Sequence, residues 1–321
     1  MMTTIPLKMC LFFCLLAPFA THAQKKSRTE KPIPGLTKLV YHVKDDNTKI
    51  KEGDFEESLV DIPLTQGYYI NDQKNGGWKY LSPDNMVTFT GNYYNDHKVN
   101  RWYYIHEQKV FSVLSFNAEG QLHGDAIGLY ATGDTAAVTP FSNGKRQGIA
   151  LRFDQHHQIT AKKYFDNNQL LADTSFYANG RIHRIHTYQD GKIMAAVTMD
   201  SLGNMLPSPT SDKEPRDTEN EEGYYMPTFP GGLQTLQLFL SKAVQYPPEA
   251  IRRKVEGKVV VSFVIDADGY IKNINVKESI DPVLDEEAKR VTALMPRWSP
   301  GIQDFLPVSV QFNLPISFKI P

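Results

Sequence analysis

The segment EGKVVVSFVIDADGYIKNINVKES at residues 256–279 decides the fold of the C-terminal part of the chain, together with DPVLDEEAKRVTALMPRW at 281–298 and PVSVQFNLPISF at 307–318. Apolar residues recur at every second position in the first and third segments. In the second they recur every three to four residues. The order is therefore strand, hairpin turn, strand, helix, strand. A short helix beginning at Pro247 precedes them.

The closing strand shows the clearest alternation. Its apolar positions are Val308, Val310, Phe312, Leu314, Ile316 and Phe318. The residues between them are mostly polar, which predicts one buried face and one wet face. Pro315 interrupts the row, and proline has no N–H to donate to a neighbouring strand. The closing strand is therefore predicted to be an edge strand.

The other elements have equally local signals. The strand Val259 to Ile265 is apolar on both faces, as a central strand is, and Gly269 closes the turn after it. Asp281 is placed to cap the helix, with Pro282 in its first turn. The predicted buried stripe of this helix is Leu284, Ala288, Val291 and Leu294 or Met295. An earlier helix is predicted to carry Leu233, Leu236, Leu240 and Ala243 on one side.

These segments resemble the C-terminal domain of the TonB family. The matching motifs are FPGG at 229–232, YPPEA at 246–250, GKVVVSFVIDADGYI at 257–271, DPVLDEEA at 281–288, MPRWSPG at 295–301 and LPISF at 314–318. The resemblance implies a three-stranded antiparallel sheet packed on helices over residues 224–321. It also implies a partner, an outer-membrane TonB-dependent receptor or another envelope protein, whose extended peptide pairs with the free edge of the last strand. The edge residues carried over are Val308, Ser309, Val310, Gln311, Phe312 and Asn313, flanked by Tyr246 and Pro247.

An exposed strand edge supports the same mode of binding, because its unpaired N–H and C=O groups are available for strand addition. Four or five bonds at about 0.5 to 1.5 kcal/mol each predict affinities of roughly mM to µM. A proline at Val310 is expected to abolish peptide capture without unfolding the domain. The alternatives are an edge that nothing uses and a homodimer formed through edge strands.

Residues 69–204 contain an internal repeat. YINDQKNGGW at Tyr69 corresponds to YYNDHKVNRW at Tyr93, and turn-like tetrads recur every 11 to 13 residues. An aromatic residue precedes nearly every turn: Tyr69, Tyr80, Tyr94, Tyr104, Phe116, Tyr130, Phe141, Phe153, Phe165, Tyr177 and Tyr188. This pattern predicts an elongated array of antiparallel β-hairpins that buries its aromatics, and it resembles MORN and YwqK-antitoxin repeats. The whole chain is thus all-β followed by α+β.

The first residues read as an export signal. MCLFFCLLAPFA at 9–20 follows Lys8, is too short to span a membrane, and leads to a cleavage site after about Ala23. Both cysteines lie inside it, so the mature chain is predicted to have no disulfide. Periplasmic location follows; an uncleaved signal would instead anchor the chain in the inner membrane. A lipoprotein attached through Cys14 is disfavoured by the bulky residues before it.

Two further segments connect these parts. Residues 24–68 are expected to form a basic leader and first strands, with a strand at Leu39 to Val43. Residues 205–223, MLPSPTSDKEPRDTENEEG, are acidic, contain three prolines and lack an apolar period, which predicts a disordered linker. The two folded parts are therefore expected to have a loose relative orientation.

No catalytic, cofactor or metal motif stands out, and the chain is not predicted to be an enzyme or to take a small-molecule substrate. A net charge of −1 gives no indication of nucleic-acid binding. The histidines at 156, 157, 183 and 186 lack the spacing of a zinc site. The turn at Asp266 resembles the start of a calcium loop, but Lys277 stands where the loop needs a glutamate.

The sequence leaves three functions open. The first is an exported envelope protein that binds an extended peptide, with the repeats as an interaction scaffold or as a stiff spacer. The second is an energy-transducing TonB component for outer-membrane transport, anchored in the inner membrane. The third is a repeat-based, antitoxin-like inhibitor that the C-terminal domain only localises.

Overall fold

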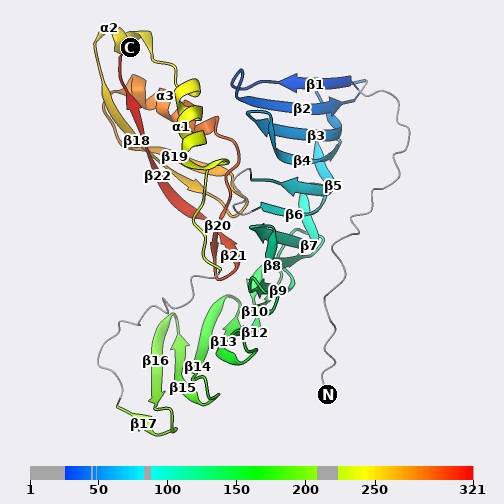
Figure 1. The fold of residues 1–321 in the computed structure, drawn as a ribbon, viewed down its shortest axis with the longest axis vertical. Helices are drawn as coiled ribbons and strands as arrows, with labels where there is room; N and C mark the ends of the chain where they lie inside the picture. Colours follow the sequence, from blue (N-terminus) through cyan, green and yellow to red (C-terminus); the bar gives the residue numbers. More distant parts are fainter. Residues whose placement is uncertain (1–25, 45, 48, 83–87, 208–222, 321) are drawn as a thin grey trace.

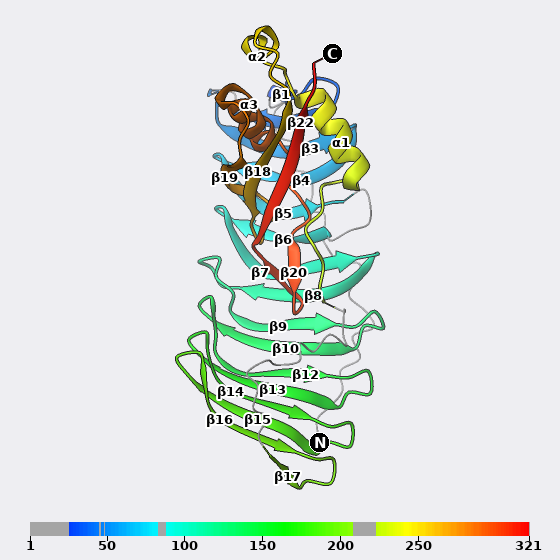
Figure 2. The same ribbon diagram turned by 90° about the vertical axis from the view of Figure 1, so that its left-hand side faces the viewer.

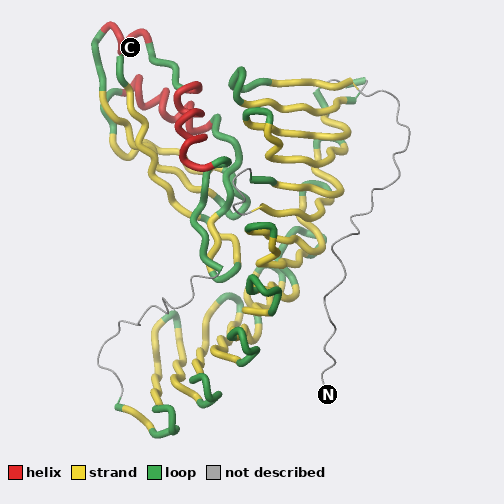
Figure 3. Tube along the Cα trace, viewed as in Figure 1, coloured by secondary structure: helices red, strands yellow, loops and turns green. Residues whose placement is uncertain are grey.

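The computed structural model describes residues 26–44, 46–47, 49–82, 88–207 and 223–320. Residues 26–206 form one 17-stranded sheet, called the array below. Residues 223–320 form a smaller C-terminal domain that lies alongside the first strands of the array (Figures 1 and 2). Within the described residues, helices occur in the C-terminal domain alone (Figure 3). The predicted signal and most of the predicted linker lie outside the described residues.

The array is a meander in which nearly every strand pairs antiparallel with its neighbour along the chain. Its strands are β1 (Lys26–Glu30), β2 (Thr37–Val43), β3 (Lys51–Leu59), β4 (Ile62–Ile70), β5 (Gln73–Tyr80), β6 (Thr88–Tyr94), β7 (His97–His106), β8 (Lys109–Phe116), β9 (Gly124–Leu129), β10 (Thr135–Ser142), β11 (Lys145–Arg146), β12 (Gly148–Phe153), β13 (Ile159–Asp166), β14 (Gln169–Phe176), β15 (Ile182–Gln189), β16 (Lys192–Met199) and β17 (Met205–Leu206). The predicted hairpin array is confirmed, and the sheet begins earlier than the predicted residue 69, with β1 at Lys26.

Two kinds of turn recur in the array. Two-residue turns such as Asn71-Asp72 and Asn95-Asp96 place both residues at positive φ, which asparagine and aspartate tolerate. In longer turns a polar side chain closes the loop: Asp154 Oδ1 accepts from the backbone N–H groups of His156 and Gln158, both at 2.9 Å. Turn spacing is readable from the sequence because asparagine and aspartate favour both turn types, although Glu107-Gln108 forms a two-residue turn without either.

Aromatic side chains fill the core of the array. Trp78 and Trp102 are at most 1% exposed, and each covers a glycine of a neighbouring strand, Gly67 and Gly91 respectively. Most predicted aromatics before turns are buried or half-buried. The prediction is wrong for Tyr94, whose side chain is 61% exposed, while that of its neighbour Tyr93 is buried. Tyr93, not Tyr94, is the residue 24 positions after Tyr69, so the repeat period identifies the buried position better than the distance to the turn.

The C-terminal domain contains the predicted three-stranded antiparallel sheet, in the order β19-β18-β22. Its elements are α1 (Gly232–Ala243), α2 (Pro248–Arg252), β18 (Gly257–Ile265), β19 (Ile271–Glu278), α3 (Pro282–Ala293), β20 (Gly301–Gln303), β21 (Leu306–Val308) and β22 (Val310–Phe318). The last predicted strand is thus divided, because β21 pairs with β20 and only β22 joins the main sheet. β18 is central, as its two apolar faces predicted.

The core of the domain lies between this sheet and the helices. Asp281 Oδ1 accepts from the N–H of Val283 at 3.0 Å and caps α3, as predicted. The predicted residues Leu284, Ala288 and Val291 of α3 are fully buried. The prediction for α1 was partly wrong: Leu233 is 69% exposed, and Phe239 is the residue that packs into the core.

The array and the domain share a hydrophobic core. Leu36, Leu59 and Leu64 of the array belong to the same buried cluster as the domain's α1, α3 and sheet. Ile302, Phe305 and Leu306 of the domain belong to the aromatic cluster of the array. The expectation of a loose relative orientation is therefore wrong, because the acidic composition of the linker carries no information on the apolar surfaces at either end of it.

The glycines beneath the tryptophans give a test of this packing. A Cβ at Gly91 would lie 2.3 Å from Cδ2 of Trp102, whereas one at Gly77 meets nothing closer than Asn92 Oδ1 at 3.9 Å. We expect Gly91→Ala to lower the free energy of unfolding by about 1 to 3 kcal/mol, because the buried indole has to shift. Gly77→Ala should change it by less than about 1 kcal/mol. Urea denaturation measures both, and equal effects would contradict the packing.

Candidate functional site

The candidate site is the outer edge of β22. Within the described part of the chain, β18 is the one strand that pairs with β22, over nine residue pairs from Gly257↔Phe318 to Ile265↔Val310. The side chains of Leu314, Ile316 and Phe318 are buried beneath the sheet. Those of Gln311, Asn313, Pro315 and Ser317 are exposed on the opposite face. The predicted alternation and the predicted edge position are both observed.

Pro315 fixes which backbone groups face outward. It lies opposite Val260 of β18 and has no N–H, so its nitrogen has to face away from β18. Backbone groups alternate along a strand in an antiparallel pair. Gln311, Asn313 and Ser317 therefore direct their N–H and C=O groups to the open edge, and the even-numbered residues bond to β18. The Ile320 N–H, which donates to Glu256 Oε1 at 2.6 Å next to β18, follows the same alternation.

This alternation changes the role of two predicted site residues. Val310 and Phe312 bond to β18, so a proline at Val310 would break the internal ladder rather than block a guest strand. Val308 lies in β21 and pairs with Gly301 of β20, and Ser309 falls between the two strands. The open edge therefore begins at β22, with Gln311 as its first outward residue, and not at Val308.

Tyr246 and Pro247 lie at the other end of the strand. The Tyr246 ring contacts Phe318 edge-on with 5.9 Å between centroids, and its hydroxyl donates to the Val255 carbonyl at 2.5 Å. Pro247 precedes α2 as its cap. Phe318 is about 17 Å along the strand from Asn313 at roughly 3.3 Å per residue. The structure thus does not bring these two residues beside the predicted edge residues, although both border the same strand.

Comparisons with known proteins bear on this region. Residues 242–320 match the model of the Gram-negative bacterial TonB protein C-terminal family. Residues 242–320 form a TonB C-terminal domain. A solution structure of the TonB C-terminal domain from Helicobacter pylori matches at 27% identity, covering 27% of this chain and 78% of that chain, with a TM-score of 0.22. A shorter fragment of that domain matches at 28% identity, covering 27% and 90%, with a TM-score of 0.21. Comparison with curated proteins gives no match.

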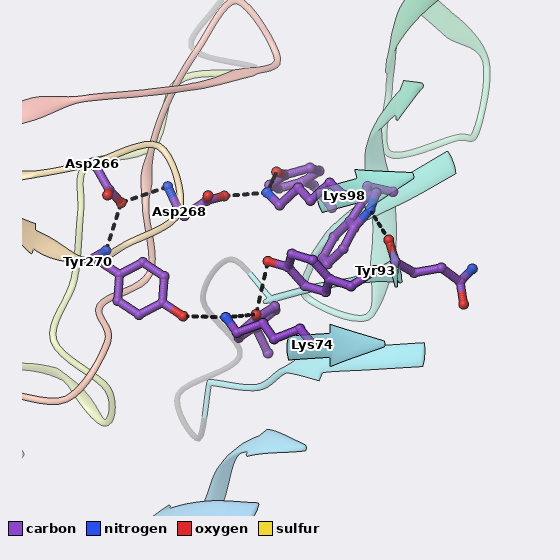
Figure 4. A network of polar contacts seen from close by, with 10 residues as sticks. Lys74, Tyr93, Lys98, Asp266, Asp268 and Tyr270 are labelled. Atoms are coloured by element: carbon purple, nitrogen blue, oxygen red, sulfur yellow. Dashed lines mark hydrogen bonds and ion pairs between the residues drawn. The ribbon is translucent and has the colours of Figure 1, made fainter. Parts of the chain in front are cut away.

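The hairpin between β18 and β19 joins the TonB domain to the array (Figure 4). Asp266 Oδ1 accepts from the N–H groups of Asp268 and Tyr270 at 2.9 and 2.8 Å, which holds the turn in shape. Tyr270 Oη accepts a hydrogen bond from Lys74 Nζ at 2.8 Å. Asp268 forms an ion pair with Lys98. The predicted plain turn is therefore also a contact point with the repeats.

Gly269 is indispensable in this turn. Its φ is +83°, and a Cβ there would lie 2.0 Å from the Trp298 carbonyl oxygen. The backbone N–H of Trp298 donates to the Gly269 carbonyl at 2.9 Å. The turn thereby rests directly on the MPRW segment of the TonB domain, which carries the next contact with the array.

Arg297 reaches the array from that segment. Its guanidinium carbon lies 3.7 Å from the Tyr80 ring centroid and 4.0 Å from that of Phe89, so it covers both adjacent rings. Arg297 is 9% exposed. Its cation–π contacts are therefore made away from water, where they are strongest. No local sequence pattern indicates this role, because Arg297 and Tyr80 are 217 positions apart.

A third contact between the TonB domain and the array lies at strands β9 and β12. The Phe305 ring of the TonB domain covers Gly128 of β9, where a Cβ would be 2.4 Å from the ring. Asp304 beside it forms an ion pair with Arg152 of β12. Phe305 thus occupies over Gly128 the kind of position that Trp78 and Trp102 occupy over Gly67 and Gly91. The TonB domain supplies a ring to the aromatic core of the array.

The described ranges contain no group of three or more histidine, cysteine, aspartate or glutamate side chains placed to hold a metal ion. They also contain no helix with the length and hydropathy to cross a membrane. The predictions of no cofactor and no catalysis remain predictions.

The Asp268–Lys98 pair predicts a dependence of stability on pH. Burial alone would raise the pKa of the Asp268 carboxyl, but Lys98 and Arg297 outweigh it and hold this pKa below its usual value. A lowered pKa contributes stability above the unfolded-state value of about 3.9, and this stability is lost as pH falls through the folded-state value.

We expect Asp268→Asn to lower the melting temperature at pH 6 to 7 and to have a diminishing effect as the pH falls below about 4. Thermal denaturation across pH measures the difference from the unmodified chain. Glu278→Gln, at an exposed position at the end of β19 farthest from the hairpin, serves as the control. A difference that stays constant down to pH 3 would show that the pair does not hold the interface.

Proposed function

We propose that this chain is an exported envelope protein whose TonB C-terminal domain binds an extended peptide by strand addition at β22. The TonB domain itself supports a protein-interaction role in the envelope. The observation that carries the finer proposal is the outward set of backbone groups at Gln311, Asn313 and Ser317. The partner is an outer-membrane receptor or another envelope protein that offers an extended segment.

The energetics suit a reversible partner. A strand paired opposite Gln311 and Asn313 would form up to four hydrogen bonds, at about 0.5 to 1.5 kcal/mol each. Pro315 contributes a carbonyl but no N–H, which weakens pairing beyond Asn313. The best register for a guest therefore covers the first half of β22.

The array acts in this proposal as a mount for the TonB domain. The spacer hypothesis in its simple form is wrong, because the domain contacts the array from the β1–β2 connection to β12 rather than extending from its far end. Three separate contacts fix the domain on one face of the sheet. A fixed domain presents β22 in one direction relative to the array, which a flexible tether cannot do.

Proline substitutions at neighbouring positions of β22 test strand addition. We expect Asn313→Pro to weaken binding of an extended peptide at least tenfold, because it removes an outward donor, while the fold survives as it does with Pro315. Phe312→Pro removes a donor to β18 and should instead unfold the TonB domain. Peptide binding by calorimetry and folding by circular dichroism measure the two effects. Unchanged binding by a folded Asn313→Pro variant would refute the proposal.

Export is tested separately. We expect the mature protein to begin near Gln24, because the apolar run at 9–20 and the small residues Thr21 and Ala23 fit a cleaved signal. The intact mass of protein purified from the envelope measures this. A full-length mass would favour the alternative of an inner-membrane anchor and, with it, an energy-transducing role.

A further inference from the structure

A cleft of about 640 Å³ lies between the face of the array and the lower end of the TonB domain. The array contributes aromatic, apolar and basic residues together with Asp96 and Asn168, and the domain contributes the Asp268 hairpin and the segment Leu306 to Val308. The volume falls in the roughly 300 to 1,000 Å³ range of small-molecule sites. The cleft is distinct from the β22 edge, whose outward residues do not line it.

Basic residues line the cleft because of the repeat. Four residues occupy equivalent positions in successive hairpins, because the backbone carbonyl of each accepts from the N–H of a turn residue in the next hairpin, at 2.8 to 3.0 Å. They are Lys51, Lys74, Leu122 and Arg146. Lys98 lies midway between Lys74 and Leu122, 24 residues from each. This basic row runs along one side of the sheet, and Leu122 interrupts it inside the cleft.

The charges of the row differ in how they are paired. Lys98 is neutralised by Asp268, and Lys74 Nζ donates to the hydroxyls of Tyr80 and Tyr270. Arg146 is different: its guanidinium lies over the Phe165 ring at 5.3 Å and has no carboxylate partner among the described residues. The cleft therefore has one half-buried guanidinium available to an anion.

The lining of the cleft includes apolar side chains on both sides. Phe141, which pairs with Arg146 in the sheet, is 9% exposed, and Leu306 of the TonB domain is 8% exposed. The polar residue Asn168 lies beside Arg146, where its Oδ1 accepts from the backbone N–H of Arg146 at 2.7 Å. Arg146 and Leu306 also line a second, smaller cavity of about 80 Å³ further down the array. Arg146 and Leu306 thus border both cavities.

We propose that this cleft binds a carboxylate joined to an apolar group, with the carboxylate on Arg146 and the apolar group against Leu122, Phe141 and Leu306. A planar guanidinium can hold a carboxylate through two parallel hydrogen bonds. Lys98 contributes less because Asp268 already occupies it. A free small carboxylic acid and the C-terminus of a peptide share this chemistry.

The test uses the full chain and matched probes. N-acetyl-phenylalanine carries one carboxylate and one ring, and its amide lacks the carboxylate. We expect calorimetry to show at least about tenfold tighter binding of the acid than of the amide, because a hydrogen bond to a charged group is lost in the amide. Arg146→Gln should remove this preference. Lys145→Gln, at the exposed neighbouring position outside the cleft, should keep it.

A second pair of probes identifies the source of the carboxylate. An acetylated tripeptide ending in phenylalanine, with a free or an amidated C-terminus, is compared with the single residue. Tighter binding of the free tripeptide indicates a peptide ligand, and tighter binding of the single residue indicates a small acid. Equal binding of acid and amide, absence of binding by either acid, or an Arg146→Gln variant that is folded and binds normally would each overturn the proposal.

Discussion

The guanidinium of Arg297 over the rings of Tyr80 and Phe89 is the contact on which the arrangement of the molecule depends. Its Nε and Nη2 atoms are buried without a hydrogen-bond partner in the described residues. Such groups are costly unless another interaction compensates, and here the two aromatic rings provide it. Because the rings belong to adjacent strands β5 and β6, the guanidinium has one place on the array where both are available. Arg297 therefore fixes the position of the TonB domain along the array.

The remaining contacts follow from that position. With Arg297 in place, the adjoining turn brings Tyr270 to Lys74 and Asp268 to Lys98, and Phe305 reaches Gly128. Buried apolar surface from the first hairpins then closes the upper end of the interface. The partly exposed Arg152–Asp304 pair adds little by itself, since surface pairs contribute about 0 to 1 kcal/mol. Rings and apolar side chains hold the domain, and the ion pairs select its register.

The repeat places a basic side chain over aromatic rings in successive hairpins of the sheet. Lys51, Lys74 and Lys98 each lie over two or more aromatic rings, so a basic residue on an aromatic surface recurs with each hairpin. The TonB domain contacts the array at Lys74 and Lys98. Below them, Arg146 faces a cleft instead of a carboxylate. A single periodic surface thus serves both as an internal mount and as a candidate ligand site.

Local sequence determined the turns, the start of α3 and the edge position of β22. Asn71-Asp72 and Gly269 specify turns through backbone conformation, Asp281 and Pro282 start α3, and Pro315 marks β22 as an edge, because each effect acts within a few residues. Tertiary structure alone decided the position of Tyr246 at the far end of β22, the division of β21 from β22 and the position of the Arg297 guanidinium over the rings of the array. These depend on surfaces brought together from distant parts of the chain, and no period or motif within one segment records which surface its side chains will meet.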